Sequence, residues 1–157
     1  MTNNPVTRIS VTYNVALITV DNLPNNMKLI SDIFSSIAQQ DINVDMISQA
    51  PPYRGHINLS FSLPSDDLIK AIGTLNKFKK DIPDLRIEVD NNNTKLSVYG
   101  ENMKDLPGVA ARLFTILASN NIEIKLVTTS EVDISYLIFE KDVDKAINAI
   151  KNEYNLQ

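Results

Sequence analysis

The sequence predicts an α+β protein made of two copies of a βαββαβ unit, each with an antiparallel sheet that carries helices on one face. Three observations lead to this prediction: an internal repeat, the same order of strand-like and helix-like segments in both halves, and a globular composition. The chain has 157 residues, of which 43% are hydrophobic and 22% are charged. This length suits one ordinary domain or two small units.

An internal repeat relates the two halves of the chain. Residues 41–47 align with residues 121–127 at an offset of 80, and the offset drops to 75 further along. The five lost residues fall in the turn-rich segment 51–55, and a deletion confined to a turn is typical of a true repeat. The aligned pairs include Ile18 with Val98, Phe34 with Phe114, and Phe61 with Tyr136. We therefore interpret the chain as a duplication. Phe34 and Phe114 are expected to be core residues of their copies.

The first copy is predicted to occupy residues 15–92. Alternating and β-branched segments predict strands, and apolar residues at spacings of three and four predict amphipathic helices. The expected elements are a strand at 16–20, a helix at 27–39, strands at 43–48 and 57–63, a helix that begins at Ser65 as its N-cap, and a strand at 85–89. This is the ferredoxin-like order of elements.

The second copy is predicted to occupy residues 94–157, after a linker at residues 91–93. Its expected elements are a strand at 95–99, a helix at 107–119, strands at 122–128 and 132–139, and a helix at 142–153. The fourth strand is missing from this order, while residues 5–14 form a strand-like segment that the first copy cannot use. Because an unpaired sheet edge exposes backbone donors and acceptors, we expect this N-terminal strand to complete the second copy.

Composition argues against several classes of function. The net charge of −4 and the pI near 4.9 disfavour binding to nucleic acid or anionic membranes. No apolar run approaches the roughly 18 residues of a membrane span, and the start of the sequence shows no secretory signal, so we expect a cytoplasmic protein. The sequence has no cysteine, a single histidine at position 56 and no adjacent glycines, so we expect no metal, no cofactor and no catalytic site in this chain.

RNA binding is an alternative that the order of elements allows, because RNA-recognition domains share it. Those domains stack bases on aromatic residues in their central strands. No basic, glycine-rich and aromatic-rich run of that kind occurs here. The acidic charge and the missing run both disfavour an RNA-binding ferredoxin-like domain.

Several segments resemble the tandem ACT region of aspartate kinases. Residues 96–114, which include Pro107 and Gly108, and residues 128–135 are similar to the second ACT unit of that family. Residues 42–49 are similar to a strand of its first ACT unit, and the similarity covers essentially the whole chain. The chain is thus identified as a relative of the regulatory region of aspartate kinase.

The resemblance implies a feedback sensor. In that family the ACT region binds end-product amino acids, lysine or threonine, forms dimers through ACT units, and restrains a kinase domain that phosphorylates aspartate with ATP. The expected partners are therefore a free amino acid, a second copy of the chain, and an aspartate kinase catalytic domain or subunit. A regulatory fragment, a β-type subunit and a free-standing homologue all remain open, as does a dimerisation module without effector.

An amino-acid effector needs partners for its carboxylate and for its ammonium group. The N–H groups at the start of a helix suit the carboxylate, and an acidic or amide side chain on a neighbouring strand suits the ammonium. By resemblance, the effector lies at interfaces between ACT units. The candidate effector-binding residues are Asn25, Asn26, Met27, Lys28, Leu29, Asp45 and Gln49 in the first copy, and Glu123, Ile124, Thr129 and Ser130 in the second.

One of these segments departs from the family, and two others leave a choice of interpretation. Residues 25–28 replace the Asp-Lys-Pro-Gly loop of the family, which removes an acid and a glycine. Thr129, Ser130 and Glu131 are either ligand contacts or a turn that a hydroxyl closes. Asp45, if buried on its strand, is either a ligand contact or half of a structural pair.

Overall fold

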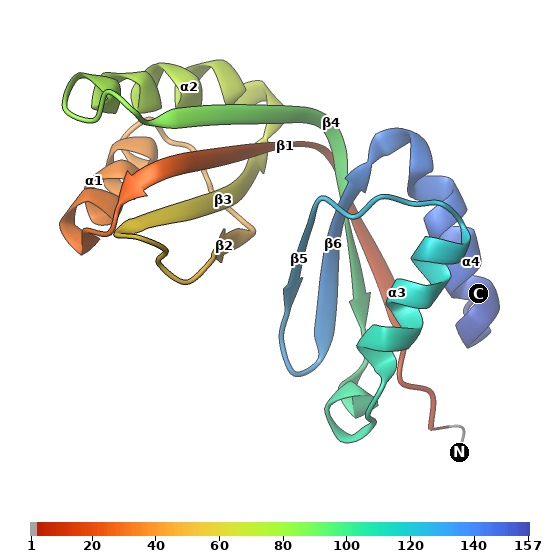
Figure 1. The fold of residues 1–157 in the computed structure, drawn as a ribbon. Coiled ribbons are helices and arrows are strands. Elements are labelled where there is room, and N and C mark those ends of the chain that lie inside the picture. The colour runs from red at the N-terminus through yellow and green to blue at the C-terminus, as the bar shows by residue number, and fades with distance from the viewer. Residues whose placement is uncertain (1–2) are drawn as a thin grey trace. The chain divides into compact units, whose positions relative to one another are not determined.

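The computed structural model describes residues 3–157, which form two compact units (Figure 1). The first copy comprises Asn14–Asn92, and the second comprises residues 3–13 together with Asn93–Gln157. In each copy, two α-helices cover one face of an antiparallel sheet (Figure 1). The predicted fold class is therefore confirmed.

The first copy has its strands in the order β2-β3-β1-β4. Its elements are β1 (Arg8–Pro24), α1 (Met27–Ala38), β2 (Ile47–Gln49), β3 (His56–Pro64), α2 (Leu68–Asn76) and β4 (Arg86–Tyr99), with single 3₁₀ segments at Ser65–Asp67 and Lys77–Lys80 on either side of α2. Ile18, Ile33 and Phe61 are fully buried in one continuous apolar core between the sheet and the two helices. The core follows from the helical and strand periodicities, because each element turns its apolar face inward.

The second copy has its strands in the order β1-β4-β6-β5. After β4 come the 3₁₀ helix η3 (Glu101–Asp105), α3 (Val109–Ser119), β5 (Leu126–Thr129), β6 (Asp133–Phe139), the 3₁₀ helix η4 (Glu140–Asp142) and α4 (Val143–Tyr154). Its separate core contains Leu96, Leu113, Tyr136 and Ile150, all with no exposed surface.

The N-terminal segment packs into the second copy. Val6 is fully buried in the core of that copy, and the backbone N–H of Thr7 donates to the Tyr99 carbonyl oxygen at 2.8 Å. The side-chain amide of Asn4 donates to the carbonyl oxygen of Tyr154 at 2.7 Å. Residues far apart in the sequence therefore build one small core.

Strands β1 and β4 each contribute residues to both copies, so the linker predicted at residues 91–93 is wrong. These residues lie inside β4. Asn92 there has φ 62°, and Asn14 in β1 has φ 57°. Asparagine tolerates this left-handed backbone better than most residues, so a strand can turn locally without ending. The polar run that suggested a linker thus lies inside a strand, at the boundary between the two copies.

The strand register corrects the alignment of the repeat. Ile18 lies opposite Phe61, and Leu96 lies opposite Tyr136. Phe61 and Tyr136 occupy equivalent positions in the two copies. Phe34 meets Phe61 edge-on at 5.6 Å between ring centroids, and Phe114 meets Tyr136 in the same way at 5.7 Å. Ile18 therefore corresponds to Leu96, at an offset of 78, and not to Val98.

This offset has a local structural meaning. The helices keep the offset of 80, so the second copy has two more residues between its first strand and its first helix than the first copy has. Residues of η3 occupy this longer connection. In the alignment of the repeat, the turn between β5 and β6 is five residues shorter than the turn between β2 and β3. The longer connection and the shorter turn make this end of the second copy different from the same end of the first.

Two local predictions are also wrong. Ser65 does not cap a helix, because it begins a 3₁₀ turn and its hydroxyl donates to the Asn91 side-chain oxygen at 2.7 Å. Phe114 is 41% exposed, although it was predicted to be a core residue. Its ring meets Tyr136 edge-on while part of it stays exposed, which the apolar stripe alone could not distinguish from full burial.

Candidate functional site

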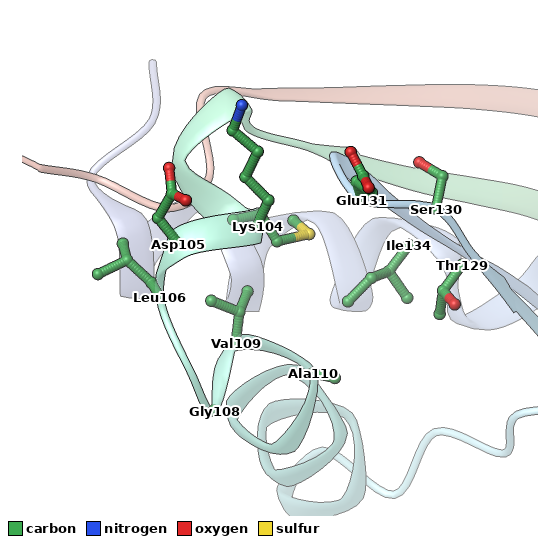
Figure 2. Close-up of a pocket in the computed structure, with 11 residues that line it drawn as sticks. Lys104, Asp105, Leu106, Gly108, Val109, Ala110, Thr129, Ser130, Glu131 and Ile134 are labelled. Carbon is green, nitrogen blue, oxygen red and sulfur yellow. The ribbon is translucent and has the colours of Figure 1, made fainter.

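An open pocket of about 590 Å³ lies at the start of α3 in the second copy. Three segments line it: η3 with the loop after it, the first turn of α3, and the turn between β5 and β6 (Figure 2). The lining residues are Met103, Lys104, Asp105, Leu106, Gly108, Val109, Ala110, Thr129, Ser130, Glu131 and Ile134. All of them belong to the second copy.

The start of α3 carries no side-chain cap. Gly108 occupies the N-cap position with φ 89° and ψ 2°, a left-handed backbone that favours glycine. The first N–H groups of a helix have no partner inside the helix, and they carry the positive end of the helix dipole. Gly108, Val109 and Ala110 line the pocket, so this helix end can receive an anionic group there.

Charged and apolar side chains divide the remaining walls. Lys104 and Asp105 come from η3, and Glu131 comes from the turn on the opposite side (Figure 2). Val109 and Ile134, which are 7% and 3% exposed, form an apolar floor between these walls. The arrangement offers a helix end to a carboxylate, two carboxylates to an ammonium group, and apolar surface to a side chain.

Thr129 and Ser130 are the predicted site residues that line this pocket. The Ser130 hydroxyl oxygen accepts hydrogen bonds from the backbone N–H groups of Val132, at 3.2 Å, and Asp133, at 3.1 Å. The Ser130 hydroxyl thus closes the turn, and the residue also lines the pocket.

Glu123 and Ile124 do not line the pocket. Glu123 is exposed, and Ile124 is half-buried against the core of the second copy. Both precede β5, which begins at Leu126 and is shorter than the strand predicted at 122–128.

The loop predicted as a site in the first copy caps its own helix. The side-chain oxygen of Asn26 accepts from the N–H groups of Lys28, at 3.0 Å, and Leu29, at 3.3 Å. The N–H of Asn25 donates to the Gly55 carbonyl oxygen at 3.0 Å, which joins this loop to the turn before β3. Met27 is 72% exposed. The N–H groups that a ligand carboxylate would use in this copy are therefore already engaged.

Asp45 and Gln49 lie at the edge strand of the first copy. Both side chains are exposed, so Asp45 is not the buried acid that its strand position suggested. The Asp45 backbone N–H donates to the Ser62 carbonyl oxygen at 3.0 Å, and Gln49 ends β2 opposite Leu59. Neither residue is among those that line the pocket of the second copy.

Sequence reasoning missed the charged residues of η3. Lys104 and Asp105 were not predicted as site residues, although Pro107 and Gly108 had marked the start of the helix. The available signal was the difference in connection length between the copies. The longer connection before the helix and the shorter turn between the strands both contribute residues to the lining of the pocket.

The described residues, 3–157, contain no cluster of three or more side chains suited to hold a metal ion. Within the same part of the chain, no helix is long and apolar enough to cross a membrane.

Comparison with known proteins identifies the family of the two copies. The family model described as "ACT domain" matches residues 18–77 and 96–154, once in each copy. The chain belongs to the ACT domain family. The two matches begin at Ile18 and Leu96, the residues that the strand register makes equivalent.

Relatives of this ACT pair are aspartokinases. The aspartokinase of Bacillus sp. (strain MGA3) is 37% identical over 157 residues, and the match covers 99% of this chain but 38% of that protein. The ACT pair thus spans well under half of the length of this relative. The resemblance to aspartate kinases that the sequence indicated is confirmed.

Solved structures give a match over nearly whole chains. A chain in the crystal structure of aspartokinase alpha and beta subunits is 32% identical, with a TM-score of 0.86, and the match covers 96% of this chain and 99% of that one. The regulatory subunit of aspartate kinase from Thermus thermophilus, in its ligand-free form, is 26% identical with a TM-score of 0.85, and the match covers 94% and 97%. Tandem ACT pairs of this size therefore occur as regulatory subunits of aspartate kinase.

Proposed function

We propose that this ACT pair is the amino-acid-sensing regulatory region of an aspartate kinase. It binds an end-product amino acid, lysine or threonine, and so takes part in feedback control of the synthesis of aspartate-derived amino acids. The observation that carries the proposal is the pocket of the second copy, where an uncapped helix end, hydroxyl groups and carboxylates meet. The regulatory subunits among the structural relatives support the same assignment.

The pocket can hold a free amino acid by its charges. The carboxylate binds the N–H groups at the start of α3, where no side chain competes with it. The ammonium group binds Asp105 or Glu131, and the side chain of the ligand contacts Val109 and Ile134. Both charged groups leave water on binding, so both need such partners.

Regulation requires that the ligand prefer one state of the protein. A ligand shifts an equilibrium only by its differential affinity for the two states, and such coupling is typically ~1–3 kcal/mol. In the proposed mechanism, two chains associate through their ACT units, and the bound amino acid favours the dimer geometry that restrains the kinase part.

A dimerisation module without effector is the second candidate function. The self-capped start of α1 favours it, because Asn26 occupies the N–H groups that a ligand carboxylate would need in the first copy. If the second copy also bound nothing, dimerisation would be the remaining role.

Calorimetric titration of the purified chain with lysine, threonine, methionine and other free amino acids tests the proposal. We expect saturable binding of one amino acid, with the oligomeric state followed alongside. Glu131→Gln should weaken that binding, whereas the same change at Glu123, outside the pocket, should not. Absence of binding by any amino acid to a folded dimer would leave the dimerisation module as the function.

The same titration distinguishes the two predicted locations. If the ligand binds at the candidate residues of the first copy, Gln49→Ala weakens binding and Glu131→Gln does not. If the ligand binds in the pocket of the second copy, the opposite pattern results.

A further inference from the structure

The N-terminal strap, which we define as residues 4–7, is fixed to the second copy at several points. Asn4 donates to the Tyr154 carbonyl oxygen at 2.7 Å, and its own side-chain oxygen accepts from the Val6 N–H at 3.2 Å. Val6 has no exposed surface. The Thr7 N–H and its hydroxyl both donate to the Tyr99 carbonyl oxygen, at 2.8 and 3.3 Å.

Gly100 is the residue on which the strap packs most closely. A Cβ at this position would overlap the carbonyl oxygen of Pro5 and would lie 3.2 Å from the Cα of Val6. The backbone of Gly100 is extended, so the need for glycine is set by this packing and not by its φ. Any side chain at Gly100 would push the strap away.

The same glycine connects to both walls of the pocket. Its N–H donates to the Val132 carbonyl oxygen at 2.8 Å, in the turn that carries Glu131. Its carbonyl oxygen accepts from the N–H of Met103 at 3.1 Å, in η3. Gly100 therefore joins three parts of the second copy: the strap, the turn between β5 and β6, and η3.

We infer that the strap and the pocket are coupled through Gly100, so that a ligand in the pocket and a docked strap stabilise each other. A ligand that contacts both walls fixes the two hydrogen bonds of Gly100, and these hold the surface on which Pro5 and Val6 pack. Coupling of this kind is reciprocal. The factor by which the ligand strengthens docking of the strap equals the factor by which the docked strap strengthens ligand binding, so undocking the strap must weaken that binding. The effect of the ligand rests on the proposed function, whereas the connection between the strap and the walls of the pocket does not.

Asn4→Ala tests the coupling, because it removes the bond to Tyr154 and the bond to Val6 without adding bulk. Asn3→Ala is the matched control, since Asn3 is exposed and adjacent in sequence. Gly100→Ala is the stronger variant, and Asn4→Ala keeps the test valid if Gly100→Ala prevents folding.

Hydrogen exchange without ligand gives the first readout. In Asn4→Ala, the amides of Gly100 and Met103 should exchange at least several-fold faster than in Asn3→Ala, while the amides of residues 16–20 in the first copy keep their rates. Equal exchange at Gly100 and Met103 in both variants would overturn the inference. This readout holds whether or not any amino acid binds.

Titration with the amino acid that binds the wild-type chain gives the second readout. Its affinity should fall about fivefold in Asn4→Ala and stay unchanged in Asn3→Ala. Its binding should also slow exchange at the Thr7 amide. Wild-type affinity in Asn4→Ala, together with unchanged exchange at Thr7, would refute the coupling. A wild-type chain that binds nothing contradicts the proposed function, and the ligand-free exchange then decides the inference by itself.

Discussion

At the scale of single residues, the two copies differ at one fully buried aromatic position. Phe61 of the first copy corresponds to Tyr136 of the second, and each ring is met edge-on by a phenylalanine. The Tyr136 hydroxyl is buried and has no hydrogen-bond partner among residues 3–157. A buried hydroxyl without a partner costs ~1–3 kcal/mol, so this phenol opposes the stability that its ring supplies.

Tyr136→Phe should therefore raise the free energy of unfolding by about 1 kcal/mol, because it removes the unsatisfied group and keeps the ring. Denaturant unfolding of the purified chain measures the change. Tyr99→Phe is the control, since Tyr99 is not buried and its loss should change stability by less than about 0.5 kcal/mol. A clear loss of stability in Tyr136→Phe would show that the hydroxyl has a partner after all.

The pH dependence of stability depends on the same group and on Tyr154. Burial raises the pKa of Tyr136 above its ordinary value of 10.0, and the neighbouring Tyr154 adds to the effect. Burial also raises the pKa of Tyr154. Both tyrosines therefore stay protonated in the folded protein at a pH where they ionise in the unfolded chain.

Since the folded-state pKa values are raised, their contribution to stability is complete below pH 10 and is lost above it. Tyr136 should lower the free energy of unfolding by up to about 1.4 kcal/mol per pH unit in that range, and Tyr154 acts in the same direction. Urea unfolding between about pH 8 and pH 11 measures the slope. Tyr136→Phe should make the slope smaller, and an unchanged slope would contradict the assignment.

At the scale of elements, equivalent helices begin differently. The start of α1 is capped by the side chain of Asn26, whereas the start of α3 has Gly108 and no side-chain cap. A cap satisfies N–H groups that otherwise need water or a ligand. The second copy thus gives up some helix stability where its pocket lies.

Asn26→Ala should lower the free energy of unfolding by about 1 kcal/mol, because Lys28 and Leu29 lose the acceptor of their N–H groups. Thermal or denaturant unfolding measures this loss. Asn25→Ala, the same substitution one residue earlier, keeps the Asn25 backbone bond to Gly55 and should be nearly neutral. Equal losses in the two variants would argue against the capping role.

The elements were predictable to different degrees, for physical reasons. Apolar periodicity indicated all four helices and the order of elements along the chain, because each element has to bury one face. It could not locate the pocket, which depends on connection lengths and on which helix N–H groups are capped. Nor could it show that Asn26 would turn its side chain back to cap α1. The resemblance to aspartate kinases indicated Asn25–Leu29 as a ligand site, because a resemblance carries over positions in the sequence and not the hydrogen bonds made there.

At the scale of the whole molecule, the order of residues along the chain differs from their order in the fold. Strand β1 begins in the second copy and ends in the first, and β4 does the reverse. The N-terminal segment contributes Val6 to the core of the second copy and nothing to the core of the first. Loss of this segment should therefore change the stability of the two copies unequally.

Deletion of the first 13 residues should destabilise the second copy more than the first. The second core would lose Val6, and the sheet edge at β4 would lose the bond from Thr7 to Tyr99. Hydrogen exchange resolved by residue compares the two copies, with amides of β3 reporting on the first and amides of β6 on the second. Equal acceleration in both strands would contradict the separate cores.

The hydrogen bond between Asn4 and Tyr154 has a consequence for protein engineering. It places the N-terminal strap beside the end of α4, at a donor–acceptor distance of 2.7 Å. A short flexible linker from Gln157 to residue 3 therefore suits a circular permutation that begins at Asn93 and ends at Tyr13. This permutant would turn the second copy into one uninterrupted polypeptide, while Asn14–Asn92 is already uninterrupted. Each ACT unit can then be produced and titrated alone, with its hydrophobic core complete.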